Sequence, residues 1–183
     1  MVILSLLLSP LAIAEPVIKQ EYAYYSVSAD SKETLLASLN SASPIRENGE
    51  VFHGYTKYNI DWHFTWKNQV KRCQLDEITT TLQLNYTMPK LDSTNQEVQT
   101  VWSNWYPHLN THEQGHGALA IIIAAKIDEG LHKMGARRDC KRLEDDANQL
   151  AYQLIAELND ASELYDEKTN HGETQKAWLY SHL

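Results

Sequence analysis

Basic side chains are scarce in this chain of 183 residues, which carries 16 lysines and arginines against 24 aspartates and glutamates, a formal net charge of −8. No basic cluster is long enough to indicate nucleic-acid binding, and an acidic balance of this size chiefly favours solubility. Beyond residue 14, no apolar run is long enough to cross a membrane. Repeats and low-complexity tracts are also missing. The length predicts one domain with its own hydrophobic core, over residues 15–183.

Only two cysteines are present, Cys73 and Cys140, and their spacing is far from any C-x-x-C pattern. They are therefore poor candidates for metal ligands. In an oxidising compartment they would form a disulfide that closes a long loop and contributes about 4 kcal/mol by the loop-entropy estimate. The alternative is a pair of unrelated buried thiols. We predict the disulfide.

The first 14 residues are apolar and uncharged and end in Ala12-Ile13-Ala14. A small residue on either side of one other residue is typical of a signal-peptidase site, and the run is too short for a permanent membrane anchor. The Lys or Arg that usually precedes such a run is missing, so an N-terminal strand is the alternative. We predict a signal peptide over residues 1–14 and a periplasmic or secreted protein.

The first half of the chain has the period-two pattern of β-strands. Residues 21–27, 51–66 and 73–88 alternate between apolar and polar side chains, and Pro89 is expected to end the third segment. A short helix over residues 32–39 separates the first two. The pattern predicts a small antiparallel meander of about three strands.

The second half switches to helical periodicity from about residue 94. Pro107 predicts a boundary, after which a long helix covers about residues 108–134. A second long helix, about residues 141–168, follows a tight connection in which Asp139 can cap it. Helices joined so closely pack antiparallel. The sequence thus predicts an α+β fold, with a small antiparallel sheet packed on one long helix that pairs with another.

The long helix opens with His112-Glu113-Gln114-Gly115-His116. Two histidines four residues apart lie on one side of a helix, so both imidazoles can bind one metal ion, while Glu113 reaches a water beside it. The alternative is a solvent-facing first turn of a core helix. The histidines continue the apolar stripe of the helix, which points them inward, and buried imidazoles are costly unless they bind something. We predict a zinc site.

A catalytic zinc site needs a third protein ligand. His112 lies about 33 Å from the helix–helix turn at 1.5 Å per residue, so a partner on the second helix must lie about as far beyond the turn, near residues 162–166 or just after them. Glu144 is too close to the turn, and Glu163 points away from the apolar stripe. His171, just past the helix end, is the preferred ligand, with Asp166 orienting an imidazole. The alternative places Asp166 on the metal.

Several of these features together resemble a bacterial family of exported, zincin-like proteins known as domain of unknown function 922 and described as secreted zinc-dependent proteases. The shared features are Trp102 and Trp105, the His112-Glu113-x-x-His116 motif, Cys140 and the segment Tyr165-Asp166-x-x-Thr169-x-His171-Gly172. The resemblance implies a zincin arrangement in which a small sheet packs on the active-site helix. It also implies that residues 74–87 form an edge strand beside the cleft that can hold an extended peptide.

The expected function is therefore that of an exported zinc metallopeptidase, a monomer with one Zn²⁺ per chain and a peptide or protein substrate. Glu113 would be the general base, and Tyr165 would help to stabilise the oxyanion. One alternative is a binding or envelope-assembly module that keeps the zincin fold without turnover. Another is a helical interaction domain that binds no metal.

Overall fold

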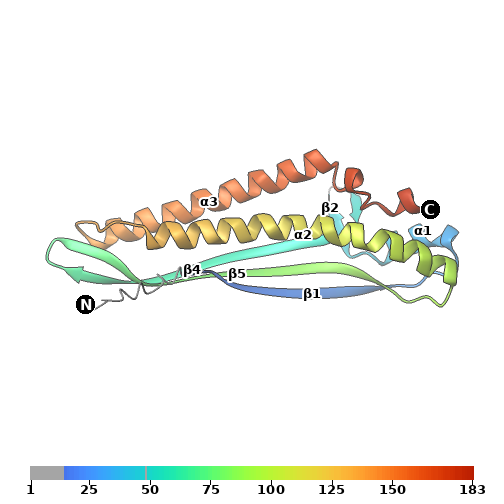
Figure 1. Ribbon diagram of the computed structural model, residues 1–183, viewed down its shortest axis with the longest axis horizontal. Helices are drawn as coiled ribbons and strands as arrows, with labels where there is room; N and C mark the ends of the chain where they lie inside the picture. The colour runs from blue at the N-terminus through green and yellow to red at the C-terminus, as the bar shows by residue number, and fades with distance from the viewer. Residues whose placement is uncertain (1–14, 48) are drawn as a thin grey trace, which may run out of the picture.

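The computed structural model describes residues 15–47 and 49–183; the expected signal peptide, residues 1–14, lies outside this part. The chain forms a small sheet and two long helices, which confirms the mixed α+β class (Figure 1). The elements are β1 (Val17–Val27), α1 (Lys32–Ala42), β2 (Ile45–Glu47), β3 (Glu50–Phe52), β4 (Tyr55–Gln69), β5 (Arg72–Leu91), α2 (Gln96–His132), α3 (Cys140–Thr169) and the 3-10 turns η1 (Glu173–Gln175) and η2 (Leu179–His182).

The main sheet has the order β1-β5-β4, and it is mixed. The β4–β5 hairpin is antiparallel, as expected, but β1 runs parallel to β5. The prediction of an all-antiparallel sheet was therefore wrong. Between β1 and β4 the chain forms α1 and the small β2–β3 hairpin. β4 then runs back along the sheet, antiparallel to β5, so that β5 returns in the direction of β1.

The position of β5 corrects two further expectations. Residues 74–87 belong to the central strand, so the edge strands are β1 and β4. Pro89 does not end β5, which continues to Leu91. Pairing with β4 stops at Thr87, so Pro89 has a neighbour only in β1, and one open flank lets a strand tolerate a residue without an N–H.

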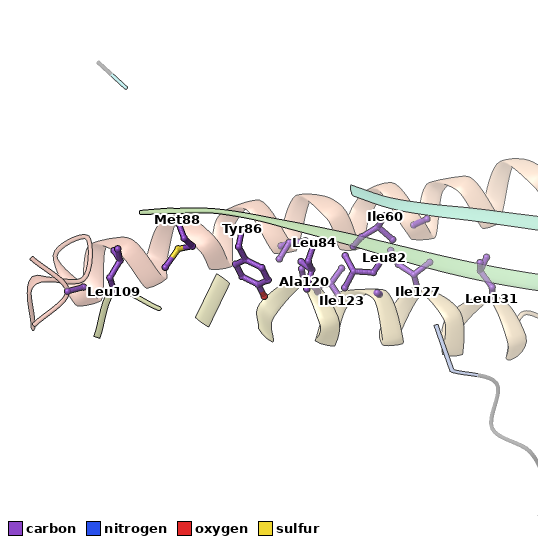
Figure 2. Packing of buried hydrophobic residues seen from close by; sticks show 14 of the residues in the cluster. Ile60, Leu82, Leu84, Tyr86, Met88, Leu109, Ala120, Ile123, Ile127 and Leu131 are labelled. Atoms are coloured by element: carbon purple, nitrogen blue, oxygen red, sulfur yellow. The ribbon is translucent and has the colours of Figure 1, made fainter. Parts of the chain in front are cut away.

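One face of the sheet is buried because the apolar residues of β5 alternate along the strand. Leu82, Leu84, Tyr86 and Met88 point toward α2, where Ala120, Ile123 and Ile127 meet them (Figure 2). The residues between them, such as Gln83 and Asn85, form the polar outer face. In Figure 1, α2 lies along the sheet and α3 covers the opposite side of α2.

Helix α2 is continuous through Pro107, so the expected boundary there was wrong. A proline inside a helix removes one backbone hydrogen bond, at a cost of about 3 kcal/mol. Packing on the N-terminal side of Pro107 offsets this cost: Val98 and Trp105 are fully buried, and the Trp105 indole donates a hydrogen bond to the Ala177 carbonyl. The Asn95 side chain caps the first turn.

The helix hairpin and the predicted disulfide are both present. The Asp139 side chain accepts a hydrogen bond from the Arg142 N–H at the start of α3. Cys73, at the start of β5, is bonded to Cys140, at the start of α3, and closes a separation of 67 residues. Paired backbone hydrogen bonds of 2.8 Å between Cys73 and Arg137 reinforce the junction. Among the residues with described structure, no helix is long and apolar enough to cross a membrane.

Candidate metal centre

A cleft of about 820 Å³ lies at the end of the molecule opposite the disulfide. One wall comes from the β2–β3 hairpin and the first residues of β4, and the other from α2, the end of α3 and residues between α3 and η2. His112, Glu113 and His116 line the cleft although their exposed fractions are only 6%, 5% and 9%. The motif thus faces the interior, as its place on the apolar stripe predicts.

His112, His116 and Asp166 form a compact donor set whose ligand atoms lie within 4.8 Å of one another. The Asp166 Oδ1 atom is 3.3 Å from His112 Nε2 and 3.1 Å from His116 Nε2. In a tetrahedral zinc site with bonds of about 2.0–2.1 Å, neighbouring ligand atoms lie about 3.3 Å apart. The two distances from Asp166 therefore match the edges of a zinc tetrahedron, and the two histidine nitrogens lie within 4.8 Å of each other.

The other nitrogen of each ring has a partner of its own. His112 Nδ1 donates to the Gln175 side-chain oxygen at 2.8 Å, and His116 Nδ1 lies 2.8 Å from the Ser162 hydroxyl. Such partners orient a metal-binding imidazole, and the Nε2 atoms of both rings face Asp166. The two histidines are buried, oriented and close to one carboxylate. This arrangement fits a zinc site better than the alternative of a solvent-facing first turn of a core helix.

Glu113 lies beside this donor set, against the start of β4. Its Oε2 accepts a 2.7 Å hydrogen bond from the Thr56 hydroxyl. Burial raises the pKa of Glu113, and the Thr56 hydrogen bond and the nearby histidines offset this only in part. A Cβ atom at Gly54 would come within 2.6 Å of Glu113 Oε1, so only glycine leaves room for the carboxylate. A buried carboxylate with a raised pKa suits a general base.

Opposing effects act on the ligands themselves. Burial raises the pKa of Asp166, but hydrogen bonds with His112 and His116 outweigh it, so the net pKa lies well below the usual range. Burial lowers the pKa of His112, but the Asp166 hydrogen bond and the Glu113 charge raise it by more, so the net shift in pKa is upward. Asp166 is thus an anion at neutral pH, as a metal ligand must be.

Among the described residues, His171 does not join the donor set. It lines the same cleft, but its ring stacks obliquely on Phe52, 5.7 Å between ring centres. The backbone explains this, because His171 adopts a left-handed conformation with φ of 48° as the chain leaves α3. The geometry therefore favours the alternative ligand, Asp166, over the preferred one.

Tyr165 packs directly on the histidine pair. Its ring stacks on His112 at 5.2 Å and meets His116 edge-on at 4.9 Å. Its hydroxyl donates to the His112 carbonyl at 3.2 Å and accepts from the Gln175 amide at 3.0 Å. These bonds give the hydroxyl a supporting role behind the histidines.

Sequence reasoning missed Gly54, Thr56, Ser162 and Gln175. Ser162 carried a detectable signal, because it lies one helical turn before Asp166 and must share its face. The other three approach the site through tertiary packing, which no local pattern reveals.

The chain matches the family described as "Bacterial protein of unknown function (DUF922)" over residues 22–172 and belongs to this family. Comparison with curated proteins and with solved structures gives no match.

Proposed function

We propose that this protein is an exported, zinc-dependent metallopeptidase in which His112, His116 and Asp166 hold the metal and Glu113 is the general base. One observation carries the proposal: two imidazole Nε2 atoms and a carboxylate oxygen converge in a buried site, with a fourth side chain of the right chemistry beside them. Three protein ligands leave one position open for water or substrate, as in catalytic rather than structural zinc sites.

The donor chemistry supports zinc. Imidazole nitrogen and carboxylate oxygen are ordinary zinc ligands, and both rings are oriented through Nδ1. When bound, zinc would lower the pKa of a coordinated water toward neutrality and polarise a carbonyl oxygen.

Glu113 would take the proton of the attacking water and later deliver it to the leaving amine. The Thr56 hydroxyl holds its Oε2, while Oε1 is left for the water. Burial excludes bulk solvent and keeps the carboxylate basic enough for this role. Tyr165 supports the histidines, so the oxyanion role suggested for it is not part of this proposal.

The proposed substrate is an extended peptide bound along the edge of β4. The first four residues of β4, 55–58, all line the cleft, so the strand presents its backbone there and not only one face. β4 has β5 on one side only, which leaves its other edge for main-chain pairing. An active-site helix beside such a strand is the zincin-like arrangement, with β4 in the place expected for residues 74–87.

An exported location is supported by the Cys73–Cys140 disulfide, because disulfides persist in oxidising compartments. The apolar residues 1–14 would be the signal peptide that directs export.

The test is zinc content and peptide hydrolysis of the purified protein with four variants. We expect about one zinc per chain, lost in Asp166→Asn and His112→Ala and kept in His171→Ala. Glu113→Gln should keep zinc and lose hydrolysis of a quenched fluorescent peptide library. Zinc without cleavage of any peptide would favour the binding-module alternative, and no zinc in the wild type would refute the metal centre.

A further inference from the structure

The C-terminal segment after α3 reaches back to the histidine pair. Residues 170–178, the C-terminal strap, lie mostly beyond residue 172, where the family match ends. We propose that Gln175, oriented by Tyr165, is a positioning residue that fixes His112 in the tautomer whose Nε2 lone pair faces the metal. This inference rests on the proposed zinc centre.

The strap turns back because three consecutive residues are left-handed. Asn170, His171 and Gly172 have φ values of 49°, 48° and 85°. At Gly172, a Cβ atom would lie 3.0 Å from His112 Cγ and 2.8 Å from Ala177 Cβ. Only glycine allows both this conformation and this approach, so the strap lies directly against the His112 ring.

The strap is fixed at both ends. The buried Trp105 indole donates to the Ala177 carbonyl at 2.8 Å, and the Gly172 N–H donates to the Thr169 hydroxyl at 3.1 Å. Within the strap, the Gln175 N–H donates to the Gly172 carbonyl at 3.0 Å. The Gln175 side chain is thus presented from a fixed backbone.

The direction of each hydrogen bond around His112 follows from two groups that can only accept. The Tyr165 hydroxyl lies 3.2 Å from both the His112 carbonyl and the Gln175 side-chain oxygen, so its one proton goes to one of these acceptors. The hydroxyl then offers a lone pair to the Gln175 NH₂ group, 3.0 Å away. This leaves the Gln175 oxygen facing His112 Nδ1 at 2.8 Å, which requires the proton on Nδ1. The Nε2 atom, 3.3 Å from Asp166, is then free to bind a metal.

His116 has no comparable device. Its Nδ1 meets the Ser162 hydroxyl, which can donate or accept and so accommodates either tautomer. The Gln175 relay therefore selects the tautomer of one ring, and a metal or Asp166 must select that of the other.

The test measures zinc affinity by competition with a chromophoric chelator and the Tm of the zinc-free protein. Gln175→Ala should weaken zinc binding about 10–100-fold, the usual effect of losing such a partner, with little change in zinc-free Tm. Gln175→Glu, whose carboxylate can only accept from Nδ1–H, should bind zinc as tightly as the wild type or more tightly. Tyr165→Phe keeps the ring but frees the Gln175 amide to rotate, so its zinc affinity should fall between those of Gln175→Ala and Gln175→Glu. Gln153→Ala, an exposed position on α3, is the matched control and should change nothing.

Affinity of Gln175→Ala within threefold of the wild type would overturn the inference. So would a Gln175→Glu variant as weak as Gln175→Ala, because the amide would then act only through packing. A wild type that binds no zinc would instead refute the metal centre itself and the inference with it.

Discussion

Gly115, the residue before His116, offers a sharp test of how the centre is packed. A Cβ atom added there would lie 2.8 Å from Tyr165 Cε1, and still closer to the ring's Cζ and hydroxyl oxygen. Carbon atoms in contact normally lie about 3.5–4.0 Å apart, so the ring would have to retreat by about 1 Å. The Tyr165 ring is rigid and stacks on His112, so it cannot move without disturbing the histidine.

The magnitude follows from two opposing effects. Ala in place of Gly inside a helix is favourable by about 1 kcal/mol. Overpacking against a rigid neighbour typically costs about 1–3 kcal/mol. Gly115→Ala should therefore lower the free energy of unfolding by up to about 2 kcal/mol. It should also weaken zinc binding about tenfold or more, because Tyr165 would lose its bonds to the His112 carbonyl and Gln175.

Gly130→Ala, on the same helix, is the matched control. Its Cβ would meet Leu150 Cδ2 at 2.7 Å, the end of a flexible side chain that can turn away. This variant should be as stable as the wild type or up to about 1 kcal/mol more stable, with unchanged zinc affinity. Urea unfolding of the zinc-free proteins and chelator competition measure both quantities. If Gly115→Ala matches Gly130→Ala in both, the packing argument is refuted.

Three further predictions concern the disulfide, a buried histidine and the general base. Replacing both Cys73 and Cys140 by Ser should lower the free energy of unfolding by about 4 kcal/mol, because the disulfide closes a separation of 67 residues. Urea titrations measure this loss, and zinc affinity should stay unchanged. A loss below about 1 kcal/mol would contradict the prediction. Burial lowers the pKa of His53 to about 4, so the unfolded chain takes up its proton first as pH falls, and about 2 kcal/mol of stability should disappear between pH 7.5 and pH 5. That loss should be absent in His53→Gln, and an equal loss in both proteins would disprove the assignment. Thr56→Val removes the donor that stabilises the Glu113 carboxylate, so the pKa of Glu113 should rise and the acid limb of the kcat/KM profile should move to higher pH; an unmoved limb would argue against Glu113 as the base.

The sequence revealed the motif, the helix hairpin and the disulfide because each rests on local periodicity or on simple pairing. The length of the hairpin also predicted a partner of the histidine pair near residues 162–166, and Asp166, the third member of the donor set, lies there. The preference for His171 weighed imidazole chemistry without the backbone, and the structure places the His171 ring against Phe52, outside the donor set. Gly172 indicates that the chain turns after α3, but not in which direction the residue before it points.

Non-local contacts account for the remaining differences. The parallel pairing of β1 with β5 arises because β5, and not β4, lies beside β1, and no strand pattern encodes that choice. Pro89 and Pro107 are both exceptions to sound local rules. An open flank of the sheet permits the first, and the buried Trp105, with its bond to Ala177, helps to hold the helix through the second.

The position of α3 relative to α2 is fixed at two places, by the disulfide at one end and by side-chain contacts around the donor set at the other. Asp166 lies 26 residues along α3 from Cys140, or about 39 Å at 1.5 Å per residue. A change of only about 2° in the angle between α2 and α3, hinged at the disulfide, would move the carboxylate by more than about 1 Å, whereas metal–ligand distances tolerate about 0.2 Å. The disulfide alone thus cannot hold the donor set. The contacts at the far end, from Ser162 to His116, from Tyr165 to His112 and from Trp105 to the C-terminal strap, supply the second point of attachment that a centre shared between two long helices requires.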